Sequence, residues 1–172
     1  MKEQKKKGID IVFCFDTTGS MYPCLSQVRS TVREAVTRLF KDIDDIRIAI
    51  IAHGDYCDSS TTYVTMINDF SRNVDDIYRF IGTVKRTGGG DSAECYEFVL
   101  NQARTELSWQ AGRTKIIVLI GDDVPHPVGY RYGSFINEID WRNELKLLIE
   151  AGINVYGVHA MPGCRTHSRN FY

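Results

Sequence analysis

Several features of other protein classes are missing from this chain, and each absence excludes a kind of function. No stretch is apolar for long enough to cross a bilayer, and the first residues lack the hydrophobic region of a signal peptide. The 21 basic and 22 acidic residues leave a net charge of −1, so no overall field attracts nucleic acid or an anionic membrane. We therefore expect neither nucleic acid nor a membrane as a partner.

A disulfide framework is also absent. The five cysteines are an odd number, and no two of them form a Cys-x-x-Cys pair. Cys14 and Cys95 lie within apolar patterns, where a thiol behaves as a small apolar residue. We interpret all five as reduced thiols, which favours a cytoplasmic location.

The chain shows no internal repeat, low-complexity segment or linker, and 172 residues is a typical length for one domain. Lysines cluster at the start, so we expect a Lys-rich tail over residues 1–7 and a single domain over residues 8–172.

Strand and helix patterns alternate along the chain. Helical spacing of apolar residues follows Pro23, Asn73, Glu94 and Trp141. Short β-branched runs predict buried strands at residues 9–15, 46–52, 115–121 and 153–159, and a short antiparallel edge strand at residues 61–66. This alternation predicts an α/β fold, a doubly wound, mostly parallel sheet with helices on both faces.

One stretch, Asp16-Thr17-Thr18-Gly19-Ser20-Met21, lies between the first strand and the first helix. Ligands of open α/β sheets bind at such turns. A carboxylate with two hydroxyls is an all-oxygen donor set that suits Mg²⁺, Ca²⁺ or Mn²⁺. The structural alternative is that Ser20 caps the following helix and Asp16 accepts hydrogen bonds from loop amides.

A second acid follows the most apolar strand. In a doubly wound sheet the strands that end at Asp16 and Asp122 can be neighbours, so their carboxyl ends share one rim. We expect Asp122 to join the site and Asp123 to be its neighbour or a loop cap. His53, His126 and His159 also end or follow strands, and we expect packing or loop hydrogen bonds of them, since no short-range spacing indicates zinc.

The Asp-x-Thr-Gly-Ser-Met stretch resembles the first motif of the von Willebrand factor A (VWA) domain, its metal-ion-dependent adhesion site. The resemblance implies that Asp16, Thr18 and Ser20 bind a divalent cation and that Asp122 belongs to the last motif of the site. It extends over roughly residues 8–160, and it is most similar to the intracellular VWA domains attached to atypical, alpha-type kinases.

The middle motif departs from the commoner VWA form, which carries a threonine there. This chain has Gly-Gly-Gly-Asp-Ser-Ala-Glu, residues 88–94. Asp91 can replace the threonine at the metal, or Asp91 and Glu94 can form a capping box at a helix start. Both interpretations stay open from the sequence.

The resemblance implies a metal-dependent protein-interaction module, with Mg²⁺ as the expected ion and an open coordination position for an Asp or Glu of a protein partner. We do not expect an enzyme. A metal-assisted hydrolase or phosphotransferase is the alternative, but the position that carries a second aspartate in haloacid-dehalogenase phosphatases is Thr18, and no lysine accompanies the glycines. A scaffold with a vestigial site is a third hypothesis.

VWA domains normally continue past the last strand found here with another helix and strand. The sequence predicts that both are missing, so we expect the domain to be truncated and to assemble with the rest of a longer chain or with another subunit. Tyr130, Tyr132 and Phe135 follow Asp122 and are expected either to form an aromatic rim for a partner or to cover the sheet.

Overall fold

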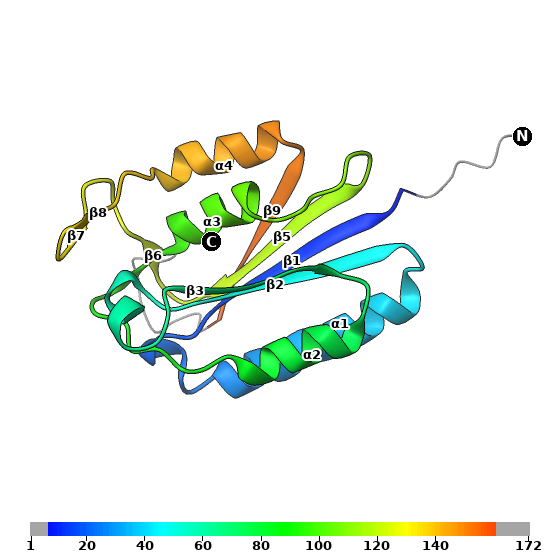
Figure 1. Ribbon diagram of the computed structural model, residues 1–172, viewed down its shortest axis with the longest axis horizontal. Coiled ribbons are helices and arrows are strands. Elements are labelled where there is room, and N and C mark those ends of the chain that lie inside the picture. Colours follow the sequence, from blue (N-terminus) through cyan, green and yellow to red (C-terminus); the bar gives the residue numbers. More distant parts are fainter. Residues whose placement is uncertain (1–6, 161–172) are drawn as a thin grey trace, which may run out of the picture.

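The computed structural model describes residues 7–160. Its core is a five-stranded sheet with the strand order β3-β2-β1-β5-β9 (Figure 1). Four strands are parallel, and β3 pairs with β2 in the antiparallel direction at one edge. The strands are β1 (Ile9–Asp16), β2 (Ile46–His53), β3 (Thr65–Ser71), β5 (Thr114–Gly121) and β9 (Ile153–His159). The predicted mostly parallel sheet with one antiparallel edge strand is confirmed.

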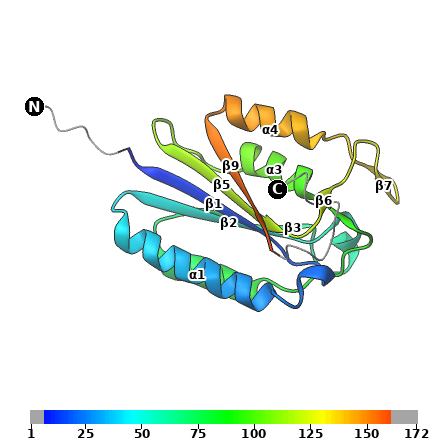
Figure 2. The same cartoon turned by 180° about the vertical axis from the view of Figure 1, so that it is seen from behind.

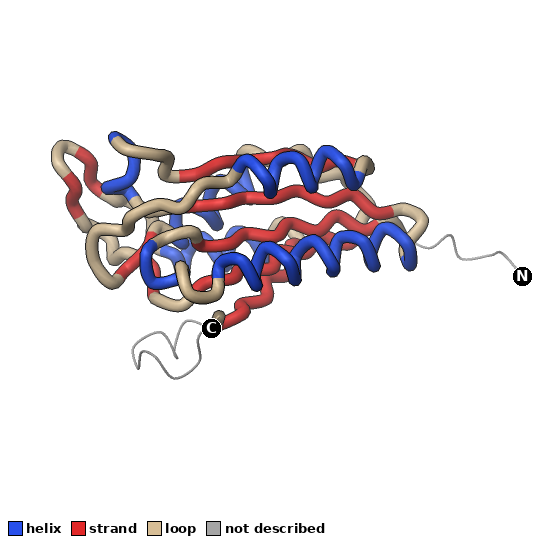
Figure 3. Tube along the Cα trace, turned by 90° about the horizontal axis from the view of Figure 1, so that it is seen from below, coloured by secondary structure: helices blue, strands red, loops and turns tan. Residues whose placement is uncertain are grey.

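Helices cover both faces of this sheet, as the sequence predicts (Figures 1 and 2). α1 (Leu25–Asp42) and α2 (Val74–Thr83) lie on one face, and α3 (Tyr96–Thr105) and α4 (Trp141–Glu150) lie on the other. Seen from below, α1 and α2 run along the direction of the strands (Figure 3). Alternate residues of β1 serve the two cores: Phe13 and Phe15 pack toward α1, and Val12 and Cys14 pack toward α3.

The edge strand lies further along the chain than the predicted range of residues 61–66. A short 3-10 helix, η2 (Tyr56–Ser60), follows β2. The N–H groups of Thr61 and Thr62 both donate to the carbonyl oxygen of Asp58, at 3.0 and 2.8 Å, and close that turn. These two residues therefore cannot join a strand, and β3 starts at Thr65.

Helix caps explain two other boundaries. Asn73 caps α2, because its side chain accepts a 2.9 Å hydrogen bond from Asp75 N. The capping box that was one interpretation of Asp91 and Glu94 does not form, because α3 begins only at Tyr96. Instead, β4 (Ala93–Glu94) pairs with β6 (Val124–Pro125). A hairpin of β7 (Arg131–Tyr132) and β8 (Phe135–Ile136) follows.

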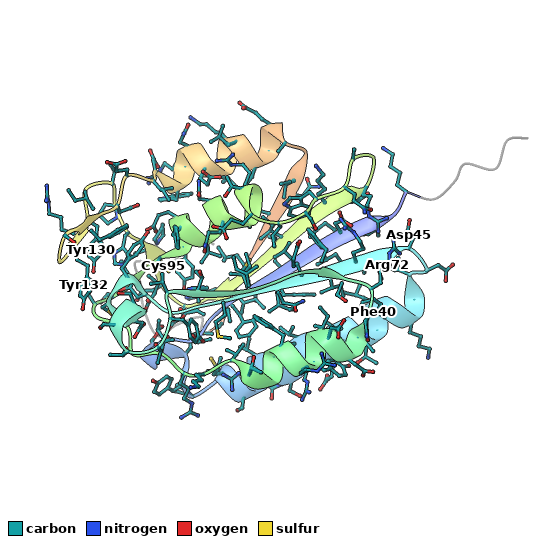
Figure 4. The ribbon with its side chains drawn as sticks, viewed as in Figure 1. Phe40, Asp45, Arg72, Cys95, Tyr130 and Tyr132 are labelled. Carbon is teal, nitrogen blue, oxygen red and sulfur yellow. The ribbon has the colours of Figure 1, made fainter. Side chains whose placement is uncertain are left out.

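A buried ion-pair network links the amino-terminal ends of β1 and β2. Asp10 is fully buried and accepts hydrogen bonds from Arg47, at 3.0 and 2.6 Å, and from Arg113 at 2.5 Å. Arg113 also pairs with Asp45, which pairs in turn with Arg72. Figure 4 shows Asp45 and Arg72 at the opposite end of the molecule from Tyr130 and Tyr132. This network therefore stabilises the fold far from the rim where the site was predicted.

Cys14, Cys57 and Cys95 are free thiols. In the part of the chain that the structure describes, no helix is both long and apolar enough to pass through a bilayer. The predictions for the first six residues of the Lys-rich tail and for the missing last helix and strand lie outside the described residues.

Candidate metal centre

The turn after β1 brings together the oxygen atoms of the first motif. Asp16 is fully buried, and its Oδ1 accepts 2.7 Å hydrogen bonds from both the N–H and the hydroxyl of Thr18. The hydroxyl oxygens of Thr18 and Ser20 are 3.5 Å apart. Asp16 thus accepts a hydrogen bond from a loop amide, as the alternative without a metal expects. Ser20, however, does not cap α1, because the N-cap of that helix is Cys24.

The last predicted motif meets the first one at the same rim. β1 and β5 are parallel neighbours, in register from Ile9 opposite Thr114 to Phe15 opposite Ile120. Their carboxyl ends therefore lie side by side, and Ser20 Oγ donates a 3.0 Å hydrogen bond to Asp122 Oδ1. Asp122 is buried, and Asp123 Oδ1 accepts from Val124 N, as a loop cap does.

A tyrosine that the sequence did not single out for the site joins the two aspartates. The hydroxyl of Tyr96 donates to Asp16 Oδ2 at 2.9 Å and accepts from Asp122 N at 3.2 Å. Tyr96 is fully buried at the start of α3. Tyr96 belongs to the buried face of α3, and only the tertiary contact gives its hydroxyl this second role.

Glu94 is a third buried carboxylate at the centre. Only 3% of its surface is exposed, and its Oε2 has no hydrogen-bond partner among the described residues. Burial, and then the negative charge of Asp16, raises the pKa of Glu94 to about 10. The charges of Asp55 and Asp122 act in the same direction, while a hydrogen bond from Thr18 opposes them. A bound cation would stabilise the ionised form of this carboxylate and give Oε2 a partner.

The glycines of the middle motif fit closely against the first motif. Asp58 accepts hydrogen bonds from Gly88 N at 2.7 Å and from Gly89 N at 3.1 Å, and Gly19 N donates to Gly88 O at 3.0 Å. Gly89 has φ of +71°, and a Cβ there would lie 3.2 Å from the Cβ of Thr18. A side chain at this position would therefore both strain the backbone and press on a predicted metal ligand.

Asp91 lies beside this centre and not among its hydrogen bonds. The side chain is exposed and accepts from Ala93 N at 3.0 Å. One oxygen of its carboxylate lies within 4.8 Å of ligand atoms of Asp55 and His126. The middle motif therefore directs Glu94, and not Asp91, toward Asp16.

Two histidines near the rim make the loop hydrogen bonds that the sequence predicts. The ring of His53 is 3.2 Å from Gly54 O, and burial lowers its pKa, so the ring is neutral. His159 Nε2 is 3.2 Å from Asp122 O.

The donor set at the rim fits a hard divalent cation. Its atoms are oxygens of carboxylates and hydroxyls, and no lysine or arginine of the described residues forms a salt bridge with Asp16 or Glu94. Buried carboxylates without a cationic partner are costly unless they are protonated or bind a metal.

Comparison with known families agrees with this geometry. The model of the von Willebrand factor type A domain matches residues 10–168. The chain belongs to this family.

Two curated proteins are similar to this chain in sequence. The alpha-protein kinase vwkA of Dictyostelium discoideum is 27% identical over 160 residues, which cover 88% of this chain and 25% of the kinase. An ariadne-like RING finger protein of Acanthamoeba polyphaga mimivirus is 28% identical over 134 residues, 77% of this chain and 13% of that protein. The chain thus spans a quarter or less of the curated relatives it matches.

Solved structures share the VWA fold at lower identity. The open conformation of the pilus adhesin SpaC from Lactobacillus rhamnosus GG superposes with a TM-score of 0.70 at 17% identity, covering 91% of this chain and 24% of SpaC. Proximal thread matrix protein 1 from the mussel byssus, solved with a zinc-occupied MIDAS motif, gives 0.63 at 20% identity, covering 88% of this chain and 35% of that protein. The VWA family and fold predicted from the sequence are confirmed.

Proposed function

We propose that this VWA domain is a metal-ion-dependent protein-interaction module whose ion is held by Asp16, Thr18 and Ser20, with Asp122 completing or orienting the site. The observation that supports it best is the hydrogen bond between Ser20 and Asp122, which joins loops that are 102 residues apart. We add Glu94 to the ligand set, because its Oε2 is buried and without a partner in the described residues.

The ion supplies an open coordination position that a carboxylate of a partner can occupy. Mg²⁺ suits the all-oxygen set, with Ca²⁺ or Mn²⁺ as alternatives, and the zinc in the mussel protein's motif makes Zn²⁺ a further ion to titrate. The partner is a protein with an exposed Asp or Glu, either another segment of a longer chain or another subunit, in the cytoplasm. We propose no catalytic step for Asp16, because both of its oxygens already accept hydrogen bonds from Thr18 and Tyr96.

Calorimetric titration of the chelator-stripped chain with Mg²⁺ tests the site, and capture of partners with and without chelator tests the function. We expect one saturable Mg²⁺ site in the wild type and in Glu138→Gln, which removes an exposed acid outside the centre. We expect none in Asp16→Ala, with circular dichroism unchanged. Partner capture at full strength in chelator would refute the interaction function, and absence of Mg²⁺ binding would favour the vestigial scaffold.

A further inference from the structure

A second group of metal-ligating side chains lies next to this centre. Asp55, Asp91 and His126 each present one ligand atom, and the three atoms lie within 4.8 Å of one another. They come from different segments: the residue before η2, the glycine-rich stretch, and the residue after β6. None of them belongs to the set proposed above for the first ion.

The histidine of this group has an unused ring nitrogen. His126 is 1% exposed, and its Nε2 lies 2.7 Å from Asp55 Oδ1. Its Nδ1 is buried and has no hydrogen-bond partner among the described residues. The ring stacks on Tyr130, with centroids 3.6 Å apart, which fixes its plane. Nε2 is therefore the ring nitrogen that faces the group, and it is the one that a metal ion shared with Asp55 would bind.

A cysteine borders the same group. Cys57 Sγ lies 3.7 Å from Asp55 Oδ2.

We propose that Asp55, Asp91 and His126 form a second divalent-cation site of the Zn²⁺ type. An imidazole nitrogen with two carboxylate oxygens is a mixed donor set, which binds Zn²⁺ in preference to Mg²⁺. Three protein ligands leave a position for water or for the Cys57 thiolate. The first centre has only oxygen donors, so the two sites differ in the metal they select.

A metal ion bound by Asp55, Asp91 and His126 would connect the loops that form the first centre. Asp55 N donates to Asp58 Oδ2, and Asp58 holds Gly88 and Gly89 against the first motif. His126 N donates to the carbonyl of Glu94 at 3.3 Å. The second ion therefore acts as a structural clamp, and its binding does not depend on whether the first centre recognises a partner.

The test is a titration of the chelator-stripped full chain with Zn²⁺, and with Co²⁺ as a spectroscopic probe, in excess Mg²⁺ to fill the first centre. The variants are Asp91→Asn, which is exposed and leaves the core intact, and His126→Asn. Asp16→Ala removes the first centre, and Glu138→Gln is the matched surface control. Circular dichroism checks that each variant is folded.

We expect the wild type, Asp16→Ala and Glu138→Gln to bind one Zn²⁺ in Mg²⁺ and to give Co²⁺ absorption bands that indicate nitrogen ligation. Asp91→Asn should bind Zn²⁺ at least tenfold more weakly and should lose the rise in melting temperature that Zn²⁺ gives the wild type. Zn²⁺ affinity unchanged in Asp91→Asn would overturn the proposal, because the ion would then bind elsewhere. Loss of Zn²⁺ binding in folded Asp16→Ala would overturn it too. Mg²⁺ titration of the same variants reports separately on the first centre.

Discussion

Ser20 Oγ donates a 3.0 Å hydrogen bond to Asp122 Oδ1, although 102 residues separate the two in sequence. The bond exists because β1 and β5 are parallel neighbours, so the turns after them share one rim of the sheet. The backbone of Asp122 is also fixed, because its N–H donates a hydrogen bond to the hydroxyl of Tyr96. Its carboxylate is therefore oriented before any ion binds.

Asp122→Asn tests that orientation. The amide keeps the shape of the side chain but removes its charge, so we expect Mg²⁺ affinity to fall about 10- to 100-fold, the usual effect of losing a group that supports metal ligands. Calorimetry measures the change, and Glu138→Gln, an exposed acid outside the rim, should keep the wild-type affinity. Equal affinities in wild type and Asp122→Asn would remove this residue from the site.

Glu94→Gln separates metal binding from stability. The pKa of Glu94 is raised to about 10, first by burial and then by Asp16, so the metal-free carboxyl is neutral at pH 7. Glutamine is a neutral group of the same size, so we expect the urea midpoint of the metal-free protein to change little. Mg²⁺ affinity should fall at least tenfold, because the amide cannot become an anion. A large loss of stability in metal-free Glu94→Gln would contradict a neutral Glu94 carboxyl in the metal-free protein.

Apolar periodicity predicted the strands and helices of the sheet. The rule that neighbouring parallel strands of a doubly wound sheet end at one rim predicted that Asp122 can reach Asp16 and Ser20. The sequence left open whether Asp91 lies at the metal or forms a capping box with Glu94, and it did not indicate Glu94 as a ligand. The two acids are three residues apart in a glycine-rich turn, and only the pairing of β4 with β6, opposite Pro125, directs Glu94 inward.

Tyr96 and Asp58 were missed for a related reason. Each has an ordinary local role, Tyr96 as an apolar residue of α3 and Asp58 in the turn of η2. Their links to the centre are long-range, through hydrogen bonds to Asp16 and to the glycine loop. Asp58 also explains why the edge strand begins later than predicted, because its carbonyl oxygen accepts hydrogen bonds from Thr61 and Thr62 and keeps both residues in the turn.

Gly89→Ala tests the close approach of the glycine loop, with Gly112→Ala as its matched control. Both glycines have positive φ, +71° and +76°, so each alanine costs about 1–2 kcal/mol in the backbone. A Cβ at Gly112 meets nothing within 4 Å, whereas at Gly89 it lies 3.2 Å from Thr18 Cβ. Urea unfolding should therefore show a larger loss for Gly89→Ala, and only that variant should lose Mg²⁺ affinity. If Gly89→Ala and Gly112→Ala lost the same stability and kept the same Mg²⁺ affinity, the glycine loop would have to shift to accommodate the added Cβ.

The network around Asp10 predicts how stability depends on pH. Burial alone would raise the pKa of Asp10, but hydrogen bonds from Arg47, Gln110 and Arg113 outweigh it and leave the pKa below its ordinary value of 3.8. The unfolded chain therefore binds this proton more readily than the folded chain does. The contribution of Asp10 is fully present above pH 3.8 and is lost as the pH falls through the lower, folded-state pKa.

Asp10→Asn leaves Arg47 and Arg113 without their shared carboxylate in the interior, so we expect it to lower the free energy of unfolding at pH 7 by about 3–5 kcal/mol. Asp45→Asn, whose side chain is 51% exposed, should cost less than about 1 kcal/mol. Urea unfolding from pH 7 down to pH 2 should show the difference between wild type and Asp10→Asn shrinking only below about pH 4. A difference that stays constant to pH 2 would mean that Asp10 stabilises the protein through packing and not through its charge.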